Sequence, residues 1–171
     1  MGANFLPTKK PTALLICGEG GHFEQARIFL GLAAKQLCCT LVTEKSVTVP
    51  SNVSVRIITL PQVSNHTKHK KLSDYLPFIS KFFVIVFYSM FIIIREKPKY
   101  IINFGPIIGL PFLVMGKILR IKLVHIETRS RFETLSTTGK YAVDLSDFIF
   151  VQNKSLLKLS EKFHYVGRLE N

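Results

Sequence analysis

Residues 13–22 read ALLICGEGGH, an apolar run that passes directly into a glycine-rich loop. Five apolar residues in succession, followed by a glycine, are typical of a strand that is buried on both faces. Beyond the loop, apolar residues recur at helical spacing across residues 22–35. This segment therefore predicts a strand, a tight loop and a helix, the opening unit of a parallel α/β sheet.

The rest of the chain repeats this alternation of short apolar runs and longer helical patterns. We expect further strands at residues 38–43, 53–60, 100–103, 122–127, 148–152 and 164–167, and helices at 73–95, from the break at 104–106 to about 119, and at 154–163. Residues 129–143 carry no clear pattern. Apolar strands separated by helices predict a Rossmann-like α/β fold, with one parallel sheet and helices on both faces.

The composition is basic and apolar at the same time. The chain has 171 residues, 47% of them hydrophobic, and its 23 Lys and Arg against 11 Asp and Glu give a net charge of +12. This hydrophobic content excludes a disordered chain, and the length fits a single domain, residues 1–171. A membrane surface fits the composition better than nucleic acid does, because no helix-turn-helix or aromatic–basic RNA pattern is present. We expect no nucleic-acid partner.

The three cysteines, Cys17, Cys38 and Cys39, contain no C-x-x-C pair, so a zinc site is not expected. All three lie in apolar runs, where buried reduced thiols are the ordinary interpretation, which weakly favours the cytosolic side of a membrane. The apolar run at residues 13–17 is too short for a signal peptide and leads into glycines rather than a cleavage site.

The glycine loop is the first candidate binding site, because ligands of parallel sheets bind where strands end and helices begin. Gly18, Gly20 and Gly21 let the backbone approach a ligand, and the following helix N-terminus offers free N–H groups to an anion. A diphosphate is the expected ligand. The dinucleotide fingerprint is incomplete, since Phe23 holds its third glycine position, and no Walker motif is present. A tight turn without a ligand is the alternative.

His22 follows the glycines directly. The dipole at a helix N-terminus disfavours the charged imidazole, so His22 is a candidate neutral base. The alternative is a polar residue that faces solvent.

Two further loops follow strands. The segment 104–109 contains Gly105 and a proline suited to the first turn of a helix, although a plain strand-to-helix junction would look the same. The segment 125–131 contains Glu127, Arg129 and Arg131. The arginines could hold phosphates bidentately, and Glu127 could take sugar hydroxyls or fix the loop, while a local salt bridge is the alternative.

Six short motifs occur in one order along the chain: GGH at 20–22, LVTE at 41–44, NFGP at 103–106 ahead of LPF at 110–112, IET at 126–128 with Arg131, LSTTGK at 135–140 and DFIFVQ at 147–152. In this order they resemble the membrane-anchor, acceptor-binding subunit of the two-part UDP-GlcNAc transferase of dolichol-linked oligosaccharide synthesis. The chain is nearer still to bacterial homologues in capsule and exopolysaccharide gene sets, and the resemblance covers residues from about 12 to 167.

The resemblance implies the N-terminal half of a GT-B glycosyltransferase, similar also to the first half of the lipid-II-forming transferase. Such a subunit supplies the acceptor site while a partner subunit binds the UDP-sugar. A sugar, GlcNAc or another hexose, would pass to a lipid-diphosphate-linked acceptor, with no activity expected without the partner. No D-x-D motif is present, so the resemblance implies a mechanism without metal or other cofactor.

On the resemblance, His22 and Glu127 are the catalytic candidates, His22 as general base for the acceptor hydroxyl. Gly18, Gly20, Gly21, Gly105, Arg129 and Arg131 are the candidates for binding the acceptor diphosphate. Two positions depart from the family pattern. Glu19 places an acid in the glycine loop, and Thr128 replaces the usual serine.

Residues 76–94 form a strongly apolar segment. Its length approaches the roughly 20 residues of a membrane span. It could span the membrane, lie in the interface or form a buried core helix. A span would separate two strands of one sheet, so interfacial docking is favoured, together with the basic loop at 68–71. The expected docking residues are Phe82, Phe83, Phe87, Phe91 and Arg95.

These inferences place the protein on the cytoplasmic face of a membrane and favour the bacterial inner membrane over the endoplasmic reticulum. Its expected partners are a UDP-sugar-binding subunit in a heterodimer, a lipid-linked saccharide acceptor and the membrane surface. The alternative function is a non-catalytic membrane adaptor that only recruits the catalytic partner.

Overall fold

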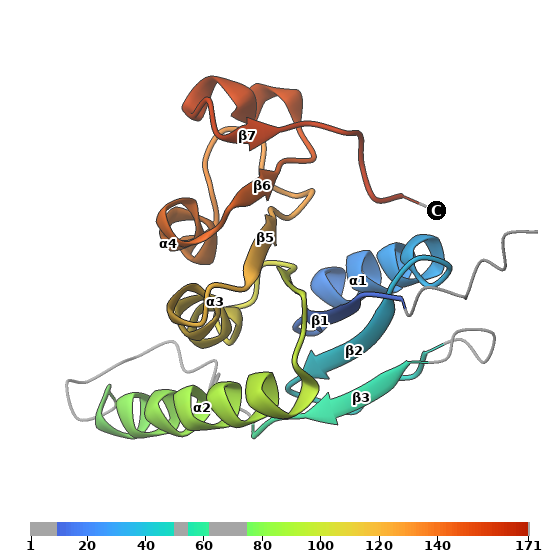
Figure 1. The fold of residues 1–171 in the computed structure, drawn as a ribbon. Coiled ribbons are helices and arrows are strands. Elements are labelled where there is room, and N and C mark those ends of the chain that lie inside the picture. Colours follow the sequence, from blue (N-terminus) through green and yellow to red (C-terminus); the bar gives the residue numbers. More distant parts are fainter. Residues whose placement is uncertain (1–9, 50–54, 62–74, 171) are drawn as a thin grey trace, which may run out of the picture.

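Seven parallel strands form one sheet in the order β3-β2-β1-β4-β5-β6-β7 in a computed structural model that describes residues 10–49, 55–61 and 75–170. The strands are β1 (Thr12–Ile16), β2 (Cys38–Thr43), β3 (Arg56–Thr59), β4 (Tyr100–Asn103), β5 (Lys122–Ile126), β6 (Phe148–Phe150) and β7 (Phe163–His164). The helices are α1 (Gly21–Ala33), α2 (Tyr75–Glu96), α3 (Gly109–Ile118), α4 (Thr137–Leu145) and the 3₁₀ helix η2 (Lys154–Leu159). Figure 1 shows this order along the chain.

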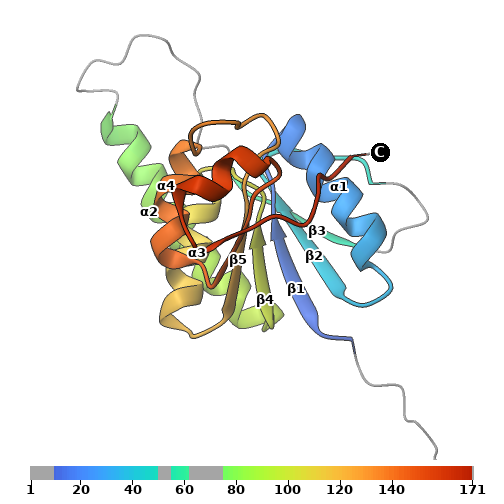
Figure 2. The ribbon, with the colours of Figure 1, turned by 90° about the horizontal axis from the view of Figure 1, so that it is seen from above.

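Helices cover both faces of the sheet. Figure 2 shows α2, α3 and α4 on one face and α1 on the other. The two faces follow from the alternation of side chains along a strand. In β1, Leu14 and Ile16 belong to the cluster beneath α2 and α3, whereas Ala13 and Leu15 belong to the cluster beneath α1. Because both faces are covered, both sets of side chains are apolar, as the sequence predicts.

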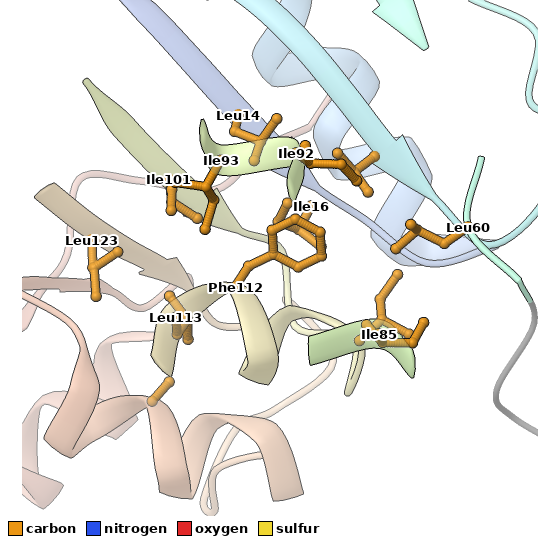
Figure 3. Close-up of a cluster of buried hydrophobic side chains, with 13 residues drawn as sticks. Leu14, Ile16, Leu60, Ile85, Ile92, Ile93, Ile101, Phe112, Leu113 and Leu123 are labelled. Atoms are coloured by element: carbon orange, nitrogen blue, oxygen red, sulfur yellow. The ribbon is translucent and has the colours of Figure 1, made fainter. Parts of the chain in front are cut away.

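The larger core lies between the sheet and helices α2 and α3. Its side chains come from the strands and from Ile85, Ile92 and Ile93 of α2 and Phe112 and Leu113 of α3, all of them buried (Figure 3). Gly116 lets α3 approach the sheet, because a Cβ there would lie 2.6 Å from Leu123 and 2.8 Å from Ile101.

The expected seven strands are present, with three differences in detail. The last strand is Phe163–His164, earlier and shorter than expected, and residues 154–159 form a 3₁₀ helix where a helix to 163 was predicted. The patternless region before β6 contains α4, which Ser136 caps by accepting a hydrogen bond from the Gly139 N–H at 2.9 Å. Residues 53 and 54 of the expected third strand lie outside the described residues.

Helix α2 presents apolar side chains to the core and to solvent. Ile85, Ser89 and Ile92 are buried, so the helix is part of the core along one side. Phe83, Phe87 and Phe91 recur every fourth residue and are 59%, 67% and 60% exposed. None of the helices in the described part of the chain combines the length and apolar character of a membrane span. The side chain of Phe82 and the basic loop at 68–71 lie outside the described residues.

The cysteines behave differently from one another. Burial raises the pKa of Cys17 to about 12, and burial with the neighbouring Cys38 raises that of Cys39 to about 11. Cys38, expected to be buried, is instead exposed at the start of β2.

Candidate functional site at the carboxyl edge of the sheet

Three loops leave the carboxyl ends of β1, β4 and β5 and lie beside one another. They are neighbours because β4 pairs with β1 on one side and with β5 on the other. The loops carry the sequence-predicted glycines, His22, Glu127 and the two arginines. The described fold therefore brings together at one edge of the sheet the segments that the sequence singles out.

The glycine loop leaves the start of α1 open. Gly20 has φ +58° and ψ −125°, a conformation that favours glycine, and it stands directly before the helix. A Cβ at Gly20 or Gly21 would meet no atom within 4 Å, and no side chain caps the helix. The free N–H groups of the first turn are therefore available to an anion.

Two other residues shape this loop. Gly18 is buried, and a Cβ there would lie 3.2 Å from the Pro106 ring, so a small residue is needed where the two loops meet. Glu19, the acid that departs from the family pattern, forms an ion pair with Lys45 at 2.7 Å. This pairing offsets the negative charge that Glu19 brings to the loop.

His22 is fixed by the neighbouring loop. Its Nδ1 lies 2.6 Å from the Phe104 carbonyl oxygen, and because that oxygen can only accept, Nδ1 carries the proton and donates. Nε2 of the neutral ring then keeps its lone pair. Burial lowers the pKa of His22 below its ordinary 6.5, and the hydrogen bond to Phe104 and the charge of Glu127 offset this only in part. The neutral ring with a free Nε2 is the form that a general base requires.

Gly105 makes room for the His22 ring. It has φ +102°, and a Cβ there would lie 2.8 Å from Cε1 and 3.0 Å from Nδ1 of His22. Both the backbone conformation and the space therefore favour glycine.

We expect Gly105→Ala to displace His22 and to lower the free energy of unfolding by about 1–3 kcal/mol, because strain and overlap add. Denaturant titration measures the loss. Gly31→Ala is the matched control, since a Cβ at Gly31 in α1 meets nothing within 4 Å and should be neutral or stabilising. Equal effects of the two substitutions would contradict the role of Gly105.

Glu127 is fully buried and is held by the loop that follows it. One oxygen accepts the Thr128 N–H at 2.9 Å, and the other accepts both the N–H and the hydroxyl of Ser136 at 3.1 Å. Gly139 packs against the same carboxylate, because a Cβ there would lie 2.0 Å from its oxygen. Glu127 therefore fastens the loop 127–136 and the start of α4 in place, which favours a positioning role over direct contact with a substrate.

Glu127 stays ionised despite its burial. Burial raises the pKa of this carboxyl, but the contact with His125 and the hydrogen bonds from Thr128 and Ser136 outweigh it and leave the pKa below 4.5. His125 Nε2 is 3.8 Å from the carboxylate, and Asn103 lies beside the other ring nitrogen at 3.4 Å. His125 is thus a core histidine next to a buried anion.

Arg129 and Arg131 project from an anchored backbone. Asn153 donates to both of their carbonyl oxygens, at 2.8 Å and 2.5 Å. Both residues are exposed, and no carboxylate among the described residues forms an ion pair with either guanidinium. Their charges are therefore available to an anion at this edge.

Two buried glutamines and Asn153 complete the site and were missed by sequence reasoning. Gln25 of α1 and Gln152 after β6 are 1% and 3% exposed and are hydrogen-bonded to each other. Their separation of 127 residues has no local signature. Only the occurrence of Gln152 in the last of the six ordered motifs could have drawn attention to it.

No group of three or more His, Cys, Asp or Glu side chains suited to a metal ion occurs within residues 10–49, 55–61 and 75–170. A cavity of about 500 Å³ lies between α1, the sheet and residues 166–169, and its lining includes none of the predicted site residues.

The comparisons with known proteins agree with this architecture. A family model described as "Oligosaccharide biosynthesis protein Alg14 like" matches residues 14–169. The mouse (Mus musculus) UDP-N-acetylglucosamine transferase subunit ALG14 is 33% identical over 93 residues, which cover 48% of this chain and 43% of that protein. The human (Homo sapiens) subunit is 33% identical over 81 residues, which cover 44% of this chain and 38% of that protein. The chain thus spans less than half the length of the curated relatives it matches.

Solved structures show the same fold at low identity. MurG of Acinetobacter baumannii superposes with a TM-score of 0.61 at 15% identity, covering 94% of this chain and 44% of that one. UDP-N-acetylglucosamine 2-epimerase of Rickettsia bellii superposes with a TM-score of 0.66 at 11% identity. The match covers 94% of this chain and 46% of the epimerase chain. These likenesses confirm the predicted Rossmann-like fold, which corresponds to a little under half of each of those two chains. Because the family model matches nearly the whole chain, the chain belongs to the Alg14-like family of oligosaccharide biosynthesis proteins.

Proposed function

We propose that this chain is the acceptor-binding and membrane-docking subunit of a glycosyltransferase. The enzyme transfers GlcNAc or another hexose from a UDP-sugar to a lipid-diphosphate-linked acceptor, in capsule, exopolysaccharide or related oligosaccharide synthesis. A partner subunit binds the UDP-sugar in a heterodimer, and the chain is inactive without it. The single observation that carries the proposal is the open N-terminus of α1 beside a neutral His22, in a member of this family.

The acceptor diphosphate binds at the glycine loop in this proposal. Gly20 and Gly21 leave space at the start of α1, where free N–H groups favour a negative charge. Arg129 and Arg131 supply charge from the third loop. Gly18 and Gly105 allow the first two loops to pack closely around His22.

His22 acts as the general base on the acceptor sugar. Its Nε2 accepts the proton of the attacking hydroxyl as that oxygen bonds to the anomeric carbon of the UDP-sugar. The bond from that carbon to UDP breaks, and UDP leaves with the electron pair. The Phe104 carbonyl holds the ring in the tautomer that this step needs. Glu127 does not touch the reacting atoms but keeps its loop in place and favours the imidazolium that forms.

The exposed phenylalanines of α2 dock the protein on the membrane in this proposal. Helix α2 connects β3 to the parallel strand β4, so it begins at the carboxyl edge of the sheet, where the acceptor loops lie (Figure 2). Arg95 near its end is 57% exposed and can meet anionic headgroups. This arrangement fits an acceptor carried by a lipid on the cytoplasmic face of the bacterial inner membrane.

Acceptor binding tests the diphosphate site. We expect Arg129→Ala with Arg131→Ala to raise the Kd for a short-chain lipid-diphosphate saccharide about tenfold or more, because two charge-assisted contacts are lost. Titration with the monophosphate analogue should show weaker binding and little effect of the variants. Arg120→Ala removes a charge from the opposite edge of the sheet and serves as control. Equal affinities of the wild type and the double variant for the diphosphate would argue against this site.

Membrane docking is tested with the exposed face of α2. Replacing Phe83, Phe87 and Phe91 together with serine should lower partitioning onto vesicles of mixed neutral and anionic lipid at least tenfold, since exposed aromatic area drives interfacial binding. Leu32→Ser is the control, because Leu32 is 70% exposed on α1, on the other face of the sheet. Unchanged sedimentation of the triple variant with vesicles would rule out this docking surface.

A further inference from the structure

A chain of hydrogen bonds through two buried glutamines links the C-terminal segment, residues 166–170, to the glycine loop. The Leu169 N–H donates to Gln152 Oε1 at 2.9 Å, the Gln152 amide donates to Gln25 Oε1, and the Gln25 amide donates to the Gly21 carbonyl at 2.9 Å. Three hydrogen bonds therefore connect the backbone at residue 169 to the backbone at the start of α1.

Gln152 uses its whole side-chain amide in this chain. Besides Gln25, its amino group donates to the Glu127 carbonyl oxygen at 2.8 Å, and its oxygen accepts from Leu169. One side chain thus contacts α1, the end of β5 and the C-terminal segment at once. Buried amides are costly unless every polar group is paired, so each of the three segments must keep its place for Gln152 to be satisfied.

A second link runs from the same segment to the arginine loop. Arg168 donates to Asn153 Oδ1 and, through Nε, to the Gln152 carbonyl at 3.2 Å. Asn153 in turn donates to the carbonyls of Arg129 and Arg131. Residues 168 and 169 are therefore connected to the glycine loop and to the loop after β5, two of the three loops that carry the candidate diphosphate-binding residues.

We propose that Gln152 is a positioning residue that couples the C-terminal segment to the acceptor site. This inference rests on the proposed function for the identity of that site. Gln152 holds the glycine loop and the loop after β5 at the spacing that the acceptor needs, and it does so only while residues 168–169 are in place.

Amide hydrogen exchange on the full chain tests the coupling without any activity. Leu169→Pro removes the N–H that Gln152 accepts, and Leu169→Ala is the matched control because it shortens the side chain but keeps the N–H. We expect exchange at residues 24–28, the first amides of α1 that are hydrogen-bonded within the helix, to rise about tenfold in Leu169→Pro and in Gln152→Leu, and to stay near wild type in Leu169→Ala. If Gln152→Leu does not fold, the comparison is made with Leu169→Pro alone. Wild-type exchange at residues 24–28 in Leu169→Pro overturns the coupling.

Kinetics of the assembled enzyme test the consequence for the acceptor. Gln152→Leu should raise the KM for the lipid-linked acceptor about tenfold, with kcat and the KM for the UDP-sugar within twofold of wild type. An equal rise in both KM values indicates a general structural role and overturns the positioning role. If the wild-type pair transfers no sugar, the proposed function fails, while the exchange experiment still decides the coupling.

Discussion

Replacing His22 with alanine should lower the rate of sugar transfer by the assembled enzyme about 10²–10⁴-fold, the usual contribution of a general base. The reason is geometric. The Phe104 carbonyl fixes the proton on Nδ1, so Nε2 is the lone pair available to the acceptor hydroxyl. The rate is measured as labelled sugar transferred to the lipid-linked acceptor at saturating UDP-sugar. Acceptor affinity should change much less, because the proposed anion contacts come from the backbone of α1 and from the arginines.

The pH dependence of sugar transfer should also report the ionisation of His22. Burial lowers the pKa of His22 below its ordinary 6.5, so the neutral, active form persists as the pH falls below 6.5. The acid limb of kcat/KM for the acceptor, which reports groups of the unliganded enzyme, should therefore lie below pH 6.5 and should be absent in His22→Ala. A limb at or above pH 6.5 would contradict this assignment.

His164→Ala is the control for loss of an imidazole, since His164 is exposed on β7. A wild-type rate in His22→Ala would instead support the non-catalytic adaptor, which needs the partner but no base on this chain. The two functions therefore predict opposite results from one variant.

Replacing Glu127 with alanine should lower the free energy of unfolding by about 3–5 kcal/mol. The Thr128 N–H and both donors of Ser136 would lose a buried acceptor, and each such loss costs about 1–3 kcal/mol before relaxation. Denaturant titration at pH 7 measures the change. The loss should also appear as faster hydrogen exchange in α4, because Ser136 caps that helix.

Glu133→Ala is the matched control, because Glu133 is an exposed carboxylate in the same loop, and its effect should stay within about 0.5 kcal/mol. The pH dependence has a defined sign. The folded-state pKa of Glu127 is below 4.5, so its stabilising effect is present above that value and is lost as the pH falls through the folded-state pKa. A loss smaller than 1 kcal/mol in Glu127→Ala would show that the buried carboxylate is not the fastening point of its loop.

The strands could be predicted because each is a short apolar run bounded by turn residues, as at residues 13–17. Helix α4 could not. Its first turn reads Thr-Thr-Gly, which has poor helix propensity, and it is held by the Ser136 cap and by the close packing of Gly139 on Glu127. Both contacts depend on the tertiary structure rather than on periodicity.

The sequence could predict which loops meet at this edge of the sheet, but not every residue there or how each side chain is held. The rule that ligands bind at the carboxyl ends of parallel strands led to His22, Glu127 and the two arginines. The sequence could not show that Ser136 and Thr128 would enclose the Glu127 carboxylate, an arrangement that favours a positioning role over a catalytic one. It also could not pair Gln25 with Gln152, because that contact joins distant elements across the sheet edge.

The apolar segment at 76–94 forms one helix with two different faces. Ile85 and Ile92 complete the core, while Phe83, Phe87 and Phe91 remain exposed. A single hydropathy profile cannot separate the two faces, since both are apolar. The periodicity of burial separates them and leaves the outward face for the proposed membrane contact.

The most direct test of the central claim is sugar transfer with purified components. The full chain, a nucleotide-sugar-binding partner from the same genome, and both together are incubated with labelled UDP-GlcNAc and a lipid-diphosphate-linked acceptor in vesicles. We predict label in the lipid fraction only when both proteins are present, and a loss of about 10²-fold or more when the chain carries His22→Ala. Transfer by either protein alone, or undiminished transfer with His22→Ala, would contradict the proposal that this chain supplies the acceptor site and its base.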